Sequence, residues 1–513
     1  MIPLAVALAV LTGASVPAQA DDLTPYLAPE LEPLAHARAV SLDLRGVGLT
    51  ADETDAIVAA GGLDDETLDA WLSTDAFADQ VVRHHKSLFL NNVVFDIDPL
   101  RTLRDYGQFG FGVWYSYFLA PTHRGASMTN CTDYDADVNA LNQPQSWRMH
   151  PNGGRDEGAV DVNPWWDLSS TIRVCAYDAQ LTEVSAAGNA CDSAEGQSDI
   201  DCGCGPNLIW CTVESQQDLV RDGLADAISE RVRDVVTQDD PYSDILTDPS
   251  RYLNGPLVEY YRNRSLFSST LTSPVPIADL PALSAADADT WVRVEGGDHL
   301  SGALTEPAWL LRFQTNRGRA NRFFTEFLCG EFIPPESGIM EIAEENPTPD
   351  LSQKPVCMDC HTVLEPWAAY WGRWQEVGAN HYDEDAYPTY NDECAECAPY
   401  CQDYYCRRNY LTRVRHPHEE DYVGTFNPYV FLVGDAEDHP TLGPALWAQE
   451  IADDGRLARC AAEKAAIWLL GTPEADIDPA LIDGFAEDFA ASGLRYRALV
   501  RSIVTSPVYG RAK

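Results

Sequence analysis

The chain has 513 residues, of which 45% are hydrophobic, so it is long enough for several domains and can bury sizeable cores. Its 80 acidic residues outnumber the 35 basic ones and give a net charge of −45 at pH 7. Such a charge repels nucleic acid and anionic membrane surfaces, so we expect neither as a partner. It suits a solvated acidic surface, a basic partner, bound calcium or a salty habitat.

Residues 1–20 predict a signal peptide. They carry no charge and end in Ala18-Gln19-Ala20 before Asp21, which is typical of a secretory cleavage site, although the usual basic start is missing. No later stretch is apolar over the roughly 20 residues that a membrane span needs. We therefore expect a periplasmic or secreted protein without a membrane span.

Residues 21–120 are predicted to form an N-terminal helical module. Asp64-Asp65-Glu66 places acidic residues in the first turn of a helix, and Leu68, Trp71 and Leu72 follow at helical spacing. A second helical run starts at Asp75. It contains His84 and His85, which point about 100° apart on a helix and are not expected to share a metal ion.

Residues 121–214 differ in kind and are predicted to be an irregular, disulfide-rich insertion with some β structure. The segment is rich in Asn, Asp, Gly and Pro, and residues 170–174 form a short β-like run. Its cysteines are Cys131, Cys175, Cys191, Cys202, Cys204 and Cys211. Cys202 and Cys204 stand too close to pair with each other and should pair elsewhere.

Residues 215–345 return to a helical pattern, and the fold class is predicted to be mainly α. An apolar stripe at i, i+4 spacing predicts a core-facing helix; it consists of Val220, Leu224, Ile228, Val232 and Val235. Pro307 begins an aromatic-rich helical region that Gly330 and Pro334-Pro335 end.

Residues 346–425 contain Cys357-Met358-Asp359-Cys360-His361, a C-x-x-C-H run typical of c-type haem attachment. Two thiols three residues apart lie on one side of a helical turn, where both can bond to the porphyrin, and the histidine can offer a nitrogen to iron. We expect one covalent haem c, held by Cys357 and Cys360 with His361 as the proximal iron ligand. The alternative is a disulfide between Cys357 and Cys360.

The spacing of Met and His residues along the sequence does not identify the second axial ligand of such a haem. Met340 is named first: it lies upstream in Gly338-Ile339-Met340, and a methionine ligand would raise the reduction potential. The alternatives are Met128, Met149, His381, His416, His418 and His439. Met358 lies inside the attachment turn and is poorly placed to reach the opposite face of the ring.

The remaining 12 of the 14 cysteines are an even number, and in an oxidising compartment they are expected to form disulfides. Four of them form a closely spaced cluster: Cys394, Cys397, Cys401 and Cys406. This cluster predicts two disulfides, with a zinc or iron–sulfur site as the alternative. Residues 426–513 are predicted to be a C-terminal helical module.

Several motifs together resemble a group of large exported planctomycete-type cytochrome c proteins, which are also common in myxobacteria-like genomes. The motifs are Phe323-Phe324-x2-Phe327-Leu328-Cys329-Gly330, Ile333-Pro334-Pro335, the C-x-x-C-H run, Trp468-Leu469-Leu470-Gly471 and the run from Leu494 to Ser506. The resemblance covers most of the chain outside residues 121–214. It implies a haem protein of helical modules and says little about a substrate.

The sequence departs from this family in two places. Glu365-Pro366-Trp367 stands where the family has an Asp-Pro-Gly-like stretch, and the cysteine cluster from Cys394 to Cys406 is an added feature. Neither removes a haem ligand. We expect an electron-transfer protein; the alternatives are a peroxidase-like oxidoreductase and an exported structural or binding protein in which haem holds the fold.

Overall fold

The computed structural model describes most of the chain. The described residues are 30–91, 102–105, 112–116, 131, 135–145, 148–149, 155–197, 199, 201–263, 265, 270–332, 350–354, 357–429 and 439–512. The predicted signal peptide, residues 1–20, lies outside them. The chain divides into two compact units: the first combines residues 1–80, 239–241 and 454–513, and the second combines residues 81–238 and 242–453.

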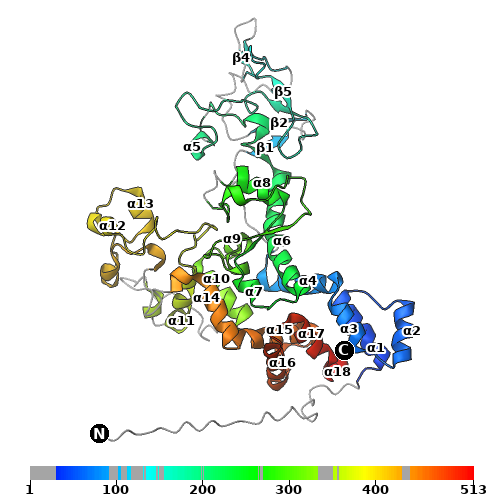
Figure 1. Cartoon of the computed structure of the whole chain (residues 1–513). Helices are drawn as coiled ribbons and strands as arrows, with labels where there is room; N and C mark the ends of the chain where they lie inside the picture. Colours follow the sequence, from blue (N-terminus) through cyan, green and yellow to red (C-terminus); the bar gives the residue numbers. More distant parts are fainter. Residues whose placement is uncertain are drawn as a thin grey trace, which may run out of the picture. The chain divides into compact units, whose positions relative to one another are not determined.

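The first unit is helical and joins the two ends of the chain. Its helices are α1 (Pro33–Arg45), α2 (Ala51–Ala60), α3 (Asp65–Leu72), the start of α4 (Asp75–Phe89), α15 (Arg456–Leu470), α16 (Pro479–Ala491), α17 (Tyr496–Thr505) and α18 (Tyr509–Ala512) (Figure 1). Asp65 and Glu66 lie in the first turn of α3, as predicted, whereas Asp64 precedes it as the N-cap and accepts a hydrogen bond from the backbone N–H of Thr67. Tyr509 of α18 donates to a carboxylate oxygen of Asp43 in α1 at 2.6 Å. The terminal modules, which are far apart in sequence, thus form one unit.

The second unit contains a five-stranded sheet in the order β5-β6-β2-β1-β7. Its strands are β1 (Thr102–Asp105), β2 (Val113–Ser116), β5 (Ala159–Val162), β6 (Ile172–Cys175) and β7 (Thr212–Val213). β1 pairs with β2 and β5 with β6 in antiparallel register, whereas β2–β6 and β1–β7 are parallel. The predicted strand at 170–174 is β6. The sheet also includes β1 and β2, upstream of residue 121, since β1 pairs with β7 and β2 pairs with β6.

The predicted disulfides are confirmed. Three bridges hold the β region: Cys131–Cys175, Cys191–Cys202 and Cys204–Cys211. Two more lie in the later cysteine cluster, Cys394–Cys406 and Cys397–Cys401. Cys329 and Cys460 are also disulfide-bonded.

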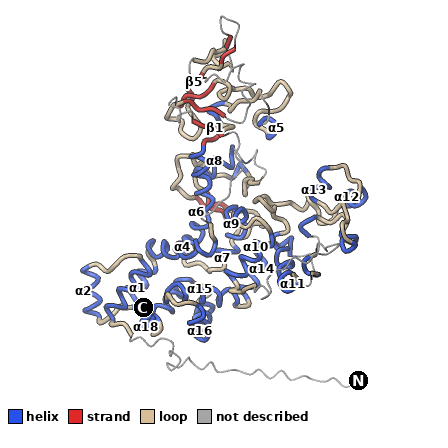
Figure 2. Tube along the Cα trace, turned by 180° about the vertical axis from the view of Figure 1, so that it is seen from behind, coloured by secondary structure: helices blue, strands red, loops and turns tan. Residues whose placement is uncertain are grey.

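Helices dominate the rest of the second unit, in agreement with the mainly α prediction. They are α5 (Ala194–Gln197), α6 (Glu214–Gln238), α7 (Asp244–Thr247), α8 (Gly255–Asn263), α9 (Pro307–Arg312), α10 (Asn316–Phe327), α11 (Met358–Ala368), α12 (Asp392–Cys397), α13 (Tyr404–Asn409) and α14 (His439–Asp453). Short 3-10 turns include η8 (Leu351–Gln353), η9 (Ala369–Trp371) and η10 (Pro417–Tyr422). Two small ribbons pair β3 (Arg148–Met149) with β4 (Arg155–Asp156), and β8 (Arg251–Leu253) with β9 (Val292–Val294). Helix and strand segments are distinguished by colour in Figure 2.

The core of this unit forms around α6, whose predicted apolar stripe is buried. A charged group is buried beside it: Glu306 Oε1 lies 3.1 Å from Nη2 of Arg231 and 3.5 Å from Nη1 of Arg251, and all three side chains are at most 2% exposed. Burial lowers the pKa of Arg251, and the charge of Glu306 opposes that shift. The three residues therefore depend on one another for charge compensation.

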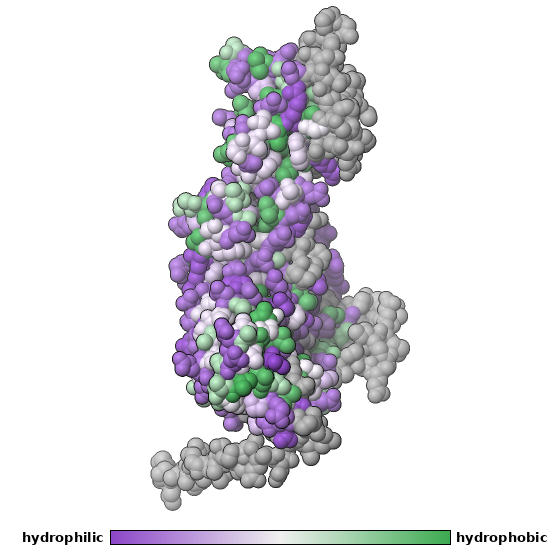
Figure 3. Space-filling model, turned by 90° about the vertical axis from the view of Figure 1, so that its right-hand side faces the viewer, coloured by the Kyte–Doolittle hydropathy of each residue, from purple (hydrophilic) through white to green (hydrophobic). Residues whose placement is uncertain are grey.

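Hydrophilic residues predominate on the face drawn in Figure 3, with smaller groups of apolar residues between them. Among the described residues, no helix combines the length and the apolar character that crossing a membrane requires.

Candidate functional site

The C-x-x-C-H run forms the first turn of α11, with Cys357 at the N-cap and Met358 as the first helical residue. The backbone N–H of His361 donates to the carbonyl of Cys357 at 2.9 Å, which closes this turn. Residues at i, i+3 and i+4 share one face of a helix, so the helical fold brings Cys357, Cys360 and His361 to the same side. Cys357 and Cys360 are half-buried and both are free thiols.

These two thiols differ in state from every other cysteine of the chain. The other 12 are in disulfides, so the alternative prediction of a Cys357–Cys360 disulfide does not hold in this structure. The alternative of a metal site in the later cysteine cluster does not hold either, because all four of its sulfurs are bonded in pairs. A donor set of two reduced thiols followed by a histidine is left on α11, and its chemistry fits haem attachment.

His361, Glu365 and Arg317 form a chain of hydrogen bonds. Nδ1 of His361 lies 2.6 Å from Oε1 of Glu365, one turn later on α11. A carboxylate only accepts, so Nδ1 carries the hydrogen and donates it, and Nε2 keeps its lone pair. Nε of Arg317 donates to the same carboxylate oxygen at 2.7 Å. This chain fixes the tautomer and the ring orientation of His361.

Aromatic side chains pack against the second half of α11. The ring of Trp367 lies 4.8 Å from that of Phe324 and 4.9 Å from that of Trp447, centroid to centroid. Trp371 and Trp374, which follow in sequence, are both buried. Packing between α10, α11 and α14 therefore holds the helix that carries the thiols, and it uses the aromatic residues as core.

A cavity of about 330 Å³ lies beside this chain of polar groups. Its lining includes Arg317, Glu365, Glu376, Arg408 and Asn427. Charged groups of both signs thus face a space next to Glu365, on residues from α10, α11 and the region of α13.

Four of the candidate second axial ligands have no described side chain. Met340 and Met128 lie outside the described residues. Met149 is in β3 and His439 begins α14, but only the backbone of each is described. For these four residues, the role of second axial ligand stays a prediction.

The other three candidates have defined surroundings. His381 stacks on His299, with ring centroids 4.4 Å apart, and burial together with His299 lowers its pKa to about 4. His416 caps η10 by accepting a hydrogen bond from the backbone N–H of His418. Nε2 of His418 lies 3.3 Å from an oxygen of Asp350, which precedes η8, and η8 packs against α11. His418 is thus tied to a segment in contact with the thiol-bearing helix.

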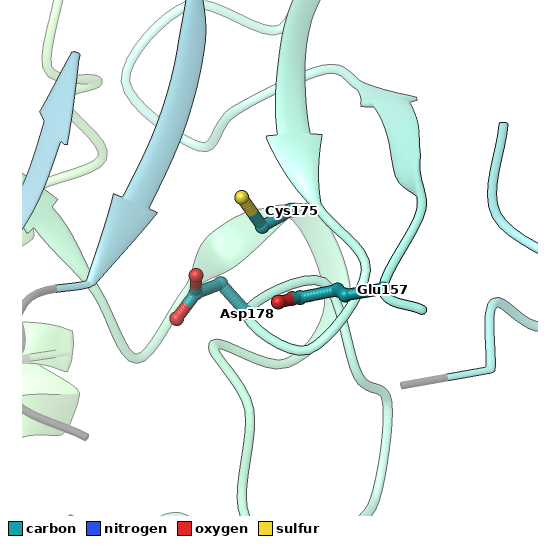
Figure 4. A group of neighbouring side chains, drawn as sticks. All are labelled: Glu157, Cys175 and Asp178. Carbon is teal, nitrogen blue, oxygen red and sulfur yellow. The ribbon is translucent and has the colours of Figure 1, made fainter. Parts of the chain in front are cut away.

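A second group of possible metal ligands lies in the β region, where Glu157, Cys175 and Asp178 approach one another (Figure 4). Cys175 is bridged to Cys131 and has no thiolate to offer. The carboxylates accept backbone hydrogen bonds, Glu157 from Tyr177 at 2.8 Å and Asp178 from Ser116 at 3.0 Å. The group therefore fits a role in holding the loop after β6 better than a thiolate–metal site.

The sequence-based interpretation missed Glu365 and Arg317. The i, i+4 spacing of His361 and Glu365 was a usable signal, because such pairs meet on a helix. The contact with Arg317 joins α10 to α11 across 48 residues and leaves no local signal in the sequence.

Comparisons with known proteins add no assignment: no family model, no curated protein and no solved structure matches this chain.

Proposed function

We propose that this chain is an exported c-type cytochrome that transfers electrons through one covalently bound haem. Cys357 and Cys360 would hold the porphyrin, and His361 would be the proximal iron ligand. The observation that carries the proposal is the pair of free thiols beside a histidine in a chain whose other 12 cysteines are oxidised. A compartment that forms disulfides would oxidise a close pair of thiols unless another bond used them. The resemblance to exported cytochromes c supports the same proposal.

The chain's own residues have defined parts in this function. When bound, the haem supplies a one-electron ferrous–ferric couple. His361 offers Nε2 because Glu365 holds the hydrogen on Nδ1. Arg317 fixes the Glu365 carboxylate from α10, so the imidazole is held by two helices. The net charge of −45 favours a basic redox partner, whose association would weaken at high ionic strength.

One observation favours a second candidate, a peroxidase-like oxidoreductase. A carboxylate that accepts the Nδ1 hydrogen makes an imidazole a stronger electron donor, which stabilises the higher oxidation states of a bound metal. The two functions differ at the second axial position, which a peroxidase needs open. A six-coordinate spectrum without peroxide turnover would favour electron transfer, and a five-coordinate spectrum with turnover would favour the second candidate.

The experiment is export of the full chain in a host with c-type haem maturation, followed by haem staining after denaturing electrophoresis and a reduced-minus-oxidised spectrum. The proposal predicts a stained band and a c-type difference spectrum. The double variant Cys357→Ser/Cys360→Ser should lose both signals. The matched control is Cys397→Ser/Cys401→Ser, which removes two cysteines of a disulfide and should keep them. An unstained wild-type band would contradict the proposal.

A further inference from the structure

Residues 388–429, which contain α12, α13 and η10, form a small lobe with its own core. Cys394, Cys401, Cys406, Tyr410 and Phe426 are buried together there. Two disulfides staple it, Cys394–Cys406 and Cys397–Cys401. Backbone hydrogen bonds also connect its loops; for example, the N–H of Leu411 donates to the carbonyl of Thr425 at 2.9 Å. The surface of this lobe is therefore held in a defined shape.

Four arginines stand within nine residues on this lobe: Arg407, Arg408, Arg413 and Arg415. They line one hollow of about 650 Å³, which we call the arginine hollow. Tyr404, Tyr410 and Thr412 belong to the same lining. In a chain with 80 acidic and 35 basic residues, such a local concentration of positive charge is unusual.

None of these four guanidinium groups forms an ion pair with a carboxylate in the described part of the chain. The guanidinium group of Arg408 donates a hydrogen bond to the hydroxyl of Tyr404 at 3.2 Å. Glu419 is the one acidic residue of the lining, and its carboxylate already accepts the backbone N–H groups of Arg415 and His416. By contrast, Arg317 and Arg373 nearby are paired with glutamates. The arginine hollow thus holds more positive charge than the protein itself balances.

We propose that the arginine hollow is a binding site for a small oxyanion, a phosphate or sulfate group. Guanidinium groups bind such oxygens through paired, charge-assisted hydrogen bonds. The net charge of −45 repels a long polyanion from a distance, whereas four arginines act on a small ion at short range within a screening length. Arg408 and Asn427 also line the cavity beside Glu365, so the site adjoins the helix that carries His361.

The proposal goes beyond the proposed haem function and does not depend on it. The test is isothermal titration calorimetry on the full exported chain with inorganic phosphate and inorganic sulfate, with heparin as a polymeric probe and sodium chloride as the blank. The expected result is saturable binding of one phosphate or sulfate per chain and no tighter binding of heparin. Binding of heparin alone would overturn the small-ion assignment.

Two double variants assign the binding to the hollow. Arg413→Gln/Arg415→Gln and Arg407→Gln/Arg408→Gln should each raise the Kd for phosphate or sulfate about tenfold or more, since each removes charge-assisted hydrogen bonds. These arginines are exposed, so the variants should keep the circular dichroism spectrum and melting temperature of the wild type. The matched control is Arg456→Gln, which removes an exposed arginine paired with Asp454 and should leave the Kd within twofold. No binding, or equal weakening in all three variants, would overturn the proposal.

Discussion

Nδ1 of His361 lies 2.6 Å from Oε1 of Glu365, so the histidine of the C-x-x-C-H run donates its hydrogen to a carboxylate on its own helix. The same oxygen accepts a hydrogen bond from Arg317, whose positive charge partly compensates the negative charge of the Glu365 carboxylate. A haem bound to Nε2 of this histidine would therefore be tuned by two residues that are not its ligands.

Replacing Glu365 by glutamine tests this tuning. Glu365→Gln should keep the covalent haem but raise its midpoint potential, because a neutral acceptor supports the ferric state less than a carboxylate does. The measurement is a spectroelectrochemical titration of both proteins.

The matched control is Asp359→Asn, which removes one acidic charge from an exposed position of the same helix. Its potential should move much less than that of Glu365→Gln. Equal shifts would mean that general charge, and not the hydrogen bond to His361, sets the potential.

The buried group of Arg231, Arg251 and Glu306 should be essential for stability. Glu306→Gln leaves two buried arginines with less charge compensation and should lower the free energy of unfolding by about 3–5 kcal/mol. The control is Asp454→Asn, which breaks an exposed pair with Arg456 and should cost about 1 kcal/mol or less. Urea unfolding of both variants measures the difference, and similar losses would refute the special role of the buried group.

Acid should destabilise the protein partly through His85, which is buried against Tyr242 and the carbonyl of Val81. Burial lowers its pKa from 6.5 to about 4. Between these values the unfolded chain binds a proton that the folded chain excludes, so stability is full above pH 6.5 and falls towards pH 4. The contribution is on the order of 3 kcal/mol.

The variant His85→Gln should therefore show a smaller loss of stability between pH 7 and pH 4.5 than the wild type. Leu88→Ala is the control, because it removes a buried side chain of the same helix that does not titrate. Leu88→Ala should lower the free energy of unfolding relative to the wild type by a similar amount at pH 7 and at pH 4.5. An unchanged pH dependence in His85→Gln would show that other groups govern the acid response.

The two disulfides of the lobe at residues 388–429 should contribute unequally. Cys394 and Cys406 close a loop of 12 residues, and Cys397 and Cys401 close one of 4. Loop-closure entropy gives about 3 kcal/mol for the longer bridge and about 2 kcal/mol for the shorter one. Hydrogen exchange within the lobe should rise more in Cys394→Ser/Cys406→Ser than in Cys397→Ser/Cys401→Ser, and the reverse order would contradict this account.

Local patterns in the sequence predicted much of the helical structure. The acidic first turn of α3 and the apolar stripe of α6 depend on neighbouring residues, and both are present in the structure. The parallel pairing of β1 with β7 joins residues about 110 positions apart, and no periodicity reports such a contact. The union of both termini in one unit is hidden for the same reason.

The candidate site also contains residues that local sequence predicts and residues that depend on contacts distant in sequence. Cys357, Cys360 and His361 are adjacent in sequence, so their spacing could be interpreted directly. Glu365 stands at i, i+4 from His361, a spacing that allows contact on a helix, but the spacing alone does not identify the hydrogen bond to Nδ1. The arginine hollow depends on how a disulfide-bonded segment folds. The spacing of its four arginines in the sequence does not specify that fold.

The most direct test of the central claim is to count reactive thiols and measure the intact mass of the exported chain after denaturation without reductant. Cys357 and Cys360 are the two free thiols of this structure. From a host with c-type haem maturation, the account predicts no alkylated cysteine and the added mass of one haem. From the same host without maturation, the expected chain lacks the haem mass, and Cys357 and Cys360 are oxidised to a disulfide. Two reactive thiols and no haem mass in the first host would contradict it.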